Sequence, residues 1–333
     1  MNISEKKIPA LFKIKPPKKG AFTIETPEHV PKLHTLMIAS GKRGGGKSVA
    51  VANYVKQLMD KKLIDRCILI TPTFQSNAEI WEPLHLNNED IHEPHKWVLK
   101  DIIKKIEGER KDWDDHQEIV KKYKSFKSII NDGIELSEVP NEAVAEFDRL
   151  GFFEGEPFWK YSKVEPPKLF VVIDDCVGMP LLSCPSAGLT QFCVKHRHYG
   201  MGLGCSVAML VQTYCGIGAI ARPIRENVTL LCLFKCIQDV QLKKIFSEVI
   251  GDEMTEEEFL ALFVHATTEP YSFLTLDFAC DDKAHMFRKR FDNYLEFNST
   301  GQDLPGKGKE KGKEKTFPKG KEKELIKKNA KII

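Results

Sequence analysis

One eight-residue stretch constrains the fold of this chain more than any other feature. Residues 41–48 read GKRGGGKS and fit the pattern GxxxxGKS of a phosphate-binding loop, the Walker A motif of nucleoside triphosphatases. The glycines let successive backbone amides and the N-terminus of a following helix point at phosphate oxygens. Lys47 would then place its charge on the β- and γ-phosphates, and Ser48 would place its hydroxyl on Mg²⁺.

The sequence around this loop is what the mechanism requires. The apolar run His34–Ala39 predicts a strand before the loop, and residues 48–59 predict a helix after it. A glycine-rich turn that happens to read GKS would need neither flank. We therefore assign nucleotide binding to the loop and the first residues of its helix: Gly41, Lys42, Arg43, Gly44, Gly45, Gly46, Lys47, Ser48 and Val49.

A second motif, an apolar run that ends in two acids, lies well downstream of the loop. Residues 169–173 read LFVVI and are followed by Asp174 and Asp175. Such a run is typical of a central parallel strand, and an acid at its carboxyl end would lie beside the phosphate loop and hold Mg²⁺ through water. Acids also end many ordinary strands, so this Walker B interpretation depends on the phosphate loop upstream.

Further apolar runs extend the predicted sheet. Cys67–Thr71, Ser206–Gln212 and Val228–Phe234 each predict a buried strand. Gln212 would meet a γ-phosphate or the attacking water, although a polar residue at a strand end can also be purely structural. Helices are predicted at 189–199, 238–250 and 255–265, the last with Thr255 as N-cap, and a closing β-hairpin is predicted from 271–278 and 285–291.

Three segments differ in composition from this core. Residues from about 80 to 165 carry dense charge of both signs, with helical spacing at 97–107 and 113–130, and predict a helical insertion within an ATPase domain of residues 31–300. Residues 1–30 read as a basic N-terminal arm. Residues 301–333 hold eleven lysines against five acids and predict a disordered tail, which is either a contact for nucleic acid or a solvated segment that aids solubility.

Composition narrows the class of protein. No apolar run reaches the roughly 18–20 residues that span a bilayer, and the lysine-rich N-terminus lacks the apolar segment of a secretory signal. We therefore expect a soluble intracellular protein with no membrane partner. The nine cysteines are scattered without a CxxC pair, which favours reduced thiols, mostly buried, over disulfides or a zinc site.

The order and spacing of these motifs resemble the FtsK/HerA superfamily of DNA-pumping ATPases, and within it the genome-packaging ATPases of poxviruses, other large DNA viruses and virophages. The resemblance covers about residues 32–294 and rests on the loop 41–48, Asp174–Asp175, Arg197–His198, Gln212 and the segment 223–227. It implies an α/β P-loop NTPase core, RecA-like, in which helices flank a mainly parallel sheet and an added strand carries Gln212 between the strands of the two nucleotide motifs. Family members often have Asp-Glu in place of Asp174–Asp175, and small residues in place of Lys42 and Arg43.

The resemblance also implies a mechanism. MgATP would bind between neighbouring subunits of a pentameric or hexameric ring that threads double-stranded DNA, without sequence preference, into a preformed capsid at the host-cell site of virion assembly. Asp174 would serve the metal with Ser48, and Asp175 would polarise the attacking water. Capsid protein is then a further partner.

An arginine supplied across the subunit interface would stabilise the transition state of such a motor. Arg225 is the first candidate, Arg197 the second and Arg222 the third, while each of them would otherwise be an ordinary surface or salt-bridging arginine. Arg43 inside the phosphate loop would either contact phosphate in its own subunit or face solvent.

Other functions share parts of this pattern. An ATP-driven DNA translocase of segregation, conjugation or recombination carries every motif named above. An ATP-dependent assembly switch with little turnover belongs to a different class, and its hydrolysis would be slow and indifferent to DNA. A small-molecule kinase is disfavoured because no arginine-rich lid follows the core and because a double acid suits activation of water.

Overall fold

The phosphate loop joins a buried strand to a helix in the computed structural model, as the sequence predicts. The model describes residue 24 and residues 26–296, apart from 217–218, 236–237 and 252–253. Nearly all of the predicted N-terminal arm and the whole lysine-rich tail lie outside the described residues. The division of the chain into arm, ATPase domain and tail therefore stays a prediction.

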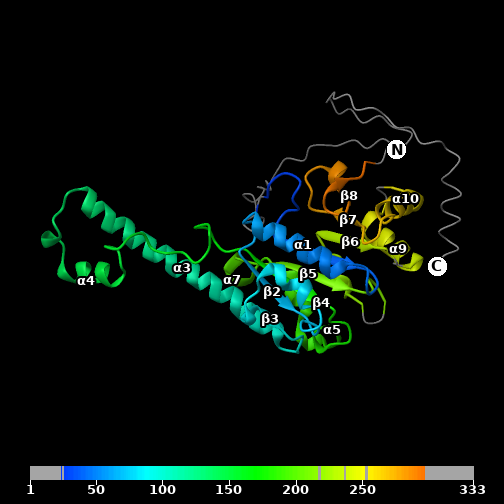
Figure 1. Ribbon diagram of the computed structural model, residues 1–333, viewed down its shortest axis with the longest axis horizontal. Helices are drawn as coiled ribbons and strands as arrows, with labels where there is room; N and C mark the ends of the chain where they lie inside the picture. The colour runs from blue at the N-terminus through cyan, green and yellow to red at the C-terminus, as the bar shows by residue number, and fades with distance from the viewer. Residues whose placement is uncertain (1–23, 25, 217–218, 236–237, 252–253, 297–333) are drawn as a thin grey trace, which may run out of the picture. The chain divides into compact units, whose positions relative to one another are not determined.

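In the described part of the chain the strands form one sheet in the order β3-β2-β4-β5-β1-β6-β7-β8-β9 (Figure 1). The pairs from β3 to β6 are parallel, and those from β6 to β9 are antiparallel. The strands are β1 (Leu36–Ser40), β2 (Arg66–Ile70), β3 (Ile91–His92), β4 (Leu169–Asp174), β5 (Ser206–Val211), β6 (Leu230–Phe234), β7 (Phe273–Asp277), β8 (Phe287–Lys289) and β9 (Asn293–Tyr294). The predicted fold class is confirmed, and β5 lies between β1 and β4 as expected of the strand before Gln212.

Apolar residues cover both faces of the central strands. In β1, Leu36 and Ile38 join the cluster on one face of the sheet, while Met37 and Ala39 join the cluster on the other face. This alternation follows from the two-residue period of a strand and explains why β1, β4 and β5 read as continuous apolar runs. The helix that follows the phosphate loop contributes Val51, Val55 and Leu58 to the second cluster.

The described helices are α1 (Lys47–Asp60), α2 (Ala78–Trp81), α3 (Val98–Asn131), α4 (Asn141–Arg149), α5 (Pro180–Ser183), α6 (Leu189–Lys195), α7 (Tyr199–Gly202), α8 (Arg222–Arg225), α9 (Asp239–Ile245) and α10 (Glu256–Ala266). Thr255 caps α10 as predicted, since its hydroxyl accepts from the Glu258 amide and the Glu258 carboxylate accepts from the Thr255 amide. No helix among the described residues is both long and apolar enough to cross a membrane. The cysteines in this part of the chain have free thiols, and Cys236 lies outside it.

Four predicted helices differ from the structure. The helices expected at 97–107 and 113–130 are one helix, α3, because the intervening residues include the strong helix formers Glu109, Arg110 and Lys111 and no proline. The helix expected at 189–199 ends at Lys195, and Gly200 and Met201 then adopt left-handed conformations. The helix expected at 238–250 is α-helical only to Ile245, and Phe246–Ile250 continue as a π-helix.

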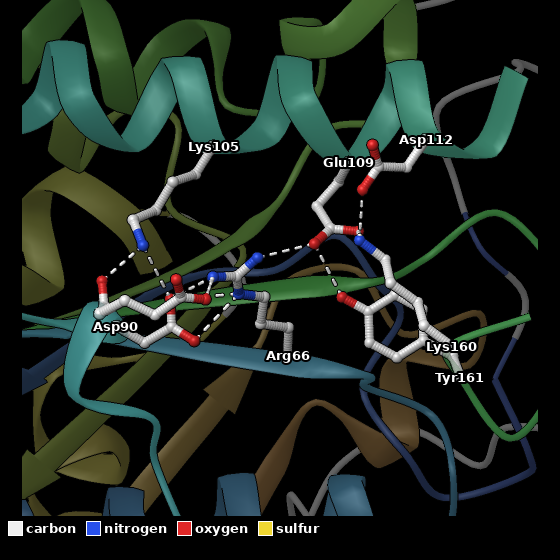
Figure 2. Close-up of polar contacts among 8 residues, drawn as sticks. Arg66, Asp90, Lys105, Glu109, Asp112, Lys160 and Tyr161 are labelled. Atoms are coloured by element: carbon white, nitrogen blue, oxygen red, sulfur yellow. Dashed lines mark hydrogen bonds and ion pairs between the residues drawn. The ribbon is translucent and has the colours of Figure 1, made fainter. Parts of the chain in front are cut away.

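An ion-pair network attaches α3 to the sheet (Figure 2). Arg66, the first residue of β2, donates from Nη2 and Nε to the Asp90 carboxylate at 2.7 and 2.9 Å and from Nη1 to Oε1 of Glu109 on α3 at 2.7 Å. Lys105 reaches Asp90 at 3.2 Å, and Lys160 reaches Glu109 at 2.9 Å. Each buried carboxylate thus has two cationic partners, which offset the cost of removing it from water.

The two halves of α3 pack against different cores. Val98, Leu99, Ile102 and Ile106 join the cluster on the first face of the sheet. The second half and α4 form a separate cluster of Tyr123, Phe126, Val139, Phe147 and Phe152. The segment between β2 and β4 is therefore largely helical, as predicted, and its far portion has an apolar core that does not include the sheet.

Candidate nucleotide-binding site

The phosphate loop is held in shape by glycines at positions where a side chain would not fit. A Cβ at Gly41 would lie 2.6 Å from the Cβ of Phe234, which is closer than atoms can approach. Gly44 and Gly46 have φ angles of 76° and 88°, in the left-handed region that favours glycine. Gly46 is also the N-cap of α1, so the free amides of the helix N-terminus face the loop.

The Lys47 side chain closes the loop on itself. Its Nζ donates to the carbonyl oxygens of Gly41 at 2.7 Å and of Lys42 at 3.0 Å, and the residue is buried. Burial lowers the pKa of Lys47, while the nearby charges of Asp174 and Asp175 act in the opposite direction. The loop therefore presents a positive charge directed at its centre, where phosphate oxygens would lie.

Ser48, in the first turn of α1, contacts Asp174, the last residue of β4. The Ser48 hydroxyl donates to Oδ2 of Asp174 at 3.0 Å and lies 3.2 Å from Oδ1. Burial raises the pKa of Asp174 to about 6, and the hydrogen bond from Ser48 partly opposes that rise. A hydroxyl and a carboxylate side by side are oxygen ligands of the kind Mg²⁺ prefers, with its remaining positions left for water and phosphate. The residues present therefore fit a magnesium ion.

Asp175 and Gln212 lie at adjacent strand ends and touch. Nε2 of Gln212 donates to Oδ1 of Asp175 at 3.3 Å, which follows from the pairing of Asp174 with Leu210 between β4 and β5. Asp175 has a φ of 50°, a left-handed conformation that is strained for a residue with a side chain and is common at functional sites. The left-handed conformation changes the direction of the chain at Asp175, directly after β4 ends at Asp174.

One cleft of about 1150 Å³ brings most of the predicted site together. Its lining includes residues 43–49, Asp174, Asp175 and Gln212. Gly41 and Lys42 do not line the cleft, and their carbonyl oxygens accept hydrogen bonds from Lys47. The lining also includes residues that the motifs did not single out: Thr73, Ser76 and Asn77 after β2, and Tyr271, Arg290 and Phe291 at one end of the β7–β8 pair. Arg43 is exposed and lines the cleft.

The three arginine candidates do not line this cleft. Arg225 is mostly buried and makes two hydrogen bonds of 2.9 Å to the carboxylate of Glu248. Arg222 is largely exposed and pairs with Glu226 at 2.7 Å. Arg197 lies where β5 begins, since the next residue back, His196, accepts from the amide of Cys205. Their action in a neighbouring subunit stays a prediction, and for Arg225 it would require exchange of the Glu248 partner.

The comparisons with known proteins concern structure alone, since no protein-family model and no curated protein matches the chain. The pCW3 conjugation coupling protein TcpA, in a monomer form with ATPγS, matches with a TM-score of 0.38 and 14% identity over 78% of this chain and 63% of that one. ATPases 2 and 3 of EssC from Geobacillus thermodenitrificans match with a TM-score of 0.41 and 14% identity over 81% and 41%.

A further match is the genome packaging NTPase B204 from Sulfolobus turreted icosahedral virus 2 with ATPγS, with a TM-score of 0.37 and 11% identity over 78% of this chain and 98% of that one. The chain thus spans less than two thirds of TcpA and of the EssC fragment. At these identities and TM-scores the matches assign no substrate or partner to this chain.

Proposed function

We propose that this protein is a Mg²⁺-dependent ATPase of the FtsK/HerA type that moves double-stranded DNA, packaging a viral genome into a preformed capsid. One observation carries the ATPase proposal. The Ser48 hydroxyl binds the Asp174 carboxylate beside the buried amine of Lys47, and Asp175 and Gln212 touch at the neighbouring strand ends. This combination supports the proposal, because it would provide contacts for phosphate, ligands for a metal ion and a polar pair for a water molecule.

Each residue has a separate task in the proposed hydrolysis. Ser48 and Asp174 would hold Mg²⁺, which neutralises charge on the phosphates when bound. Lys47 would exchange the carbonyl oxygens of Gly41 and Lys42 for phosphate oxygens. Asp175 would accept a proton from the attacking water, and Gln212 would orient that water through its contact with the Asp175 carboxylate.

The coupling to DNA is supported by the order of the motifs rather than by any nucleic-acid contact. We propose a homo-oligomeric ring of five or six subunits around the duplex, with phosphate contacts that make binding independent of sequence and strongly dependent on salt. Arg225, Arg197 or Arg222 would complete the site of the next subunit. Capsid protein would be the partner that receives the DNA.

ATP hydrolysis by the full chain, measured with and without long duplex DNA, tests the proposal. We expect strong stimulation by duplex, a steep fall in stimulation with salt, and no activity in the Lys47→Ala variant. Hydrolysis that is slow and unaffected by DNA would instead identify an assembly switch. Electron microscopy with an ATP analogue and duplex provides the second readout, because a persistent monomer would contradict the ring.

The roles of the two acids are separated by two substitutions of equal size. Asp175→Asn should abolish turnover and spare binding of MgATP, because the metal ligand is intact. Asp174→Asn should weaken the dependence of ATP binding on Mg²⁺. If Asp175→Asn lost ATP binding, the assignment of Asp175 to the water would be withdrawn.

A further inference from the structure

The sheet order determines which end of the cleft is left for the nucleobase. Asp174, Asp175 and Gln212 follow β4 and β5, which lie on one side of β1. If the loop after β1 holds the triphosphate with its γ-phosphate toward these residues, the sugar and base extend to the other side of β1, where β6 and β7 lie. The base of a nucleotide bound as proposed above is therefore expected beside the β7–β8 pair.

Tyr271 and Arg290 line this end of the cleft, together with Phe273, Phe291 and Asp292. Tyr271 lies just before β7 and Arg290 just after β8, and the Arg290 amide donates to the carbonyl oxygen of Phe273 at 2.8 Å. The Tyr271 side chain lies against the phosphate loop, since a Cβ at Gly46 would be 3.2 Å from its ring. Tyr271 is nevertheless 71% exposed, so this aromatic ring is not part of the core.

The backbone at both positions is strained. Tyr271 and Arg290 have φ angles of 60° and 57°, in a region where a residue with a side chain is disfavoured and glycine is not. An exposed tyrosine gains little from burial that could offset this strain. Backbone outliers of this kind are enriched at ligand sites, and these two border the same cleft.

Three aromatic rings that also line the cleft pack together at this end. Tyr54 of α1 stacks on Phe291 with ring centroids 4.5 Å apart, and Phe291 meets Phe273 edge-on at 5.1 Å. The Arg290 guanidinium is held by Asp292, whose Oδ1 lies 3.3 Å from Nε. Tyr271 and Arg290 therefore lie next to a packed group of aromatic rings beside the phosphate loop.

We infer that Tyr271 and Arg290 form the seat of the nucleobase, with the Tyr271 ring stacking on the base and the Arg290 guanidinium offering a second planar, cationic surface. This inference rests on the proposed function. Stacking uses the face of the base and not its edge, and a purine has the larger face, so the ligand class is a purine nucleoside triphosphate. Tyr271 contributes equally to ATP and GTP binding, and less to binding of the smaller pyrimidine nucleotides.

The test compares ATP with inorganic tripolyphosphate, which carries the phosphates without a base. Tyr271→Gly removes the ring and relieves the strained φ, so the variant is expected to keep its fold, which its Tm checks. We expect its affinity for ATP and GTP to fall about tenfold or more and its affinity for tripolyphosphate to stay unchanged. Tyr271→Phe, which keeps the ring, retains the wild-type affinity for ATP.

Met201→Gly is the matched control. Met201 is also exposed and left-handed, with a φ of 52°, and it does not line the cleft. Its replacement should leave all three affinities unchanged. Wild-type affinity of Tyr271→Gly for ATP, or an equal loss for tripolyphosphate, overturns the inference, whereas failure of the wild type to bind either ligand overturns the proposed function as well.

Discussion

Removal of Arg66 should destabilise the protein by leaving a buried carboxylate short of partners. Arg66→Met deletes the guanidinium and keeps an aliphatic chain of similar length. Asp90 is 2% exposed and would lose its contacts of 2.7 and 2.9 Å with Arg66. It would keep Lys105, at 3.2 Å, as a cationic partner.

The magnitude follows from these contacts. Removing one partner of a buried ion pair costs roughly 3–5 kcal/mol, because the other charge stays buried. Lys105 still compensates Asp90, and Lys160 with Tyr161 still compensates Glu109. We therefore expect the free energy of unfolding to fall by about 3 kcal/mol, at the lower end of that range.

Urea unfolding of the full chain, followed by tryptophan fluorescence, measures this loss. Lys127→Met is the control, because the Lys127–Glu156 pair is more than half exposed on both sides and solvent screens it, so its loss should leave the stability close to that of the wild type. Adding Asp90→Asn to Arg66→Met removes the stranded charge and should recover roughly 1–2 kcal/mol. Equal stability of Arg66→Met and wild type, or a double variant no more stable than the single one, would refute this reasoning.

Further predictions concern the site itself. In the metal-free protein the folded pKa of Asp174, about 6, lies above its usual value of 3.8, so folding favours the protonated form and stability falls as pH rises through about 4 to 6. Thermal unfolding across this range should show Asp174→Asn gaining on the wild type by roughly 2–3 kcal/mol, and a constant difference would contradict the assignment. Gly41→Ala should lower Tm and ATP affinity together, because its Cβ would lie 2.6 Å from Phe234, at a cost of about 1–3 kcal/mol. Gly44→Ala, where nothing lies within 4 Å, should lose only about 1–2 kcal/mol from its backbone strain, and a larger loss than that of Gly41→Ala would sink the comparison.

The central sheet could be predicted from the sequence because burial on both faces leaves a plain signal. Three runs are apolar at nearly every position: one ends before the phosphate loop, one before Asp174 and one before Gln212. Only parallel strands that are covered on both faces require such a pattern. The two-residue strands β3 and β9 carry no such signal. They pair at the edges of the sheet, where one neighbour is enough.

The helix breaks could not be predicted, because their causes are distant in sequence. After α6 has ended at Lys195, the chain turns left-handed at Gly200, where an added Cβ would lie 3.1 Å from the carbonyl oxygen of Ile106 on α3. The helical pattern of residues 189–199 contains no sign of that contact. The ion pair of Arg225 could not be predicted either, because its partner Glu248 lies in the π-helical turn after α9.

The candidate site divides in the same way. Lys47, Ser48, Asp174, Asp175 and Gln212 could be predicted to meet because each follows a strand, and parallel strands end at one edge. Tyr271 and Arg290 flank short antiparallel strands at the open end of the β7–β8 pair, and neither residue type indicates a left-handed φ. A tyrosine and an arginine in a hairpin are otherwise unremarkable in sequence.

The two ends of the parallel strands therefore have different roles. The carboxyl ends of β1, β4 and β5 carry the residues proposed to bind and hydrolyse ATP. Arg66 lies at the amino end of β2, as its first residue, and there it holds α3 through Glu109 (Figure 2). Because Arg66 and the cleft lie at opposite ends of the strands, loss of the Arg66 network should lower stability without changing the contact between Ser48 and Asp174. A change in ATP affinity of Arg66→Met, measured where the variant is fully folded, would mean that the insertion and the nucleotide site are coupled through β2 and are not independent.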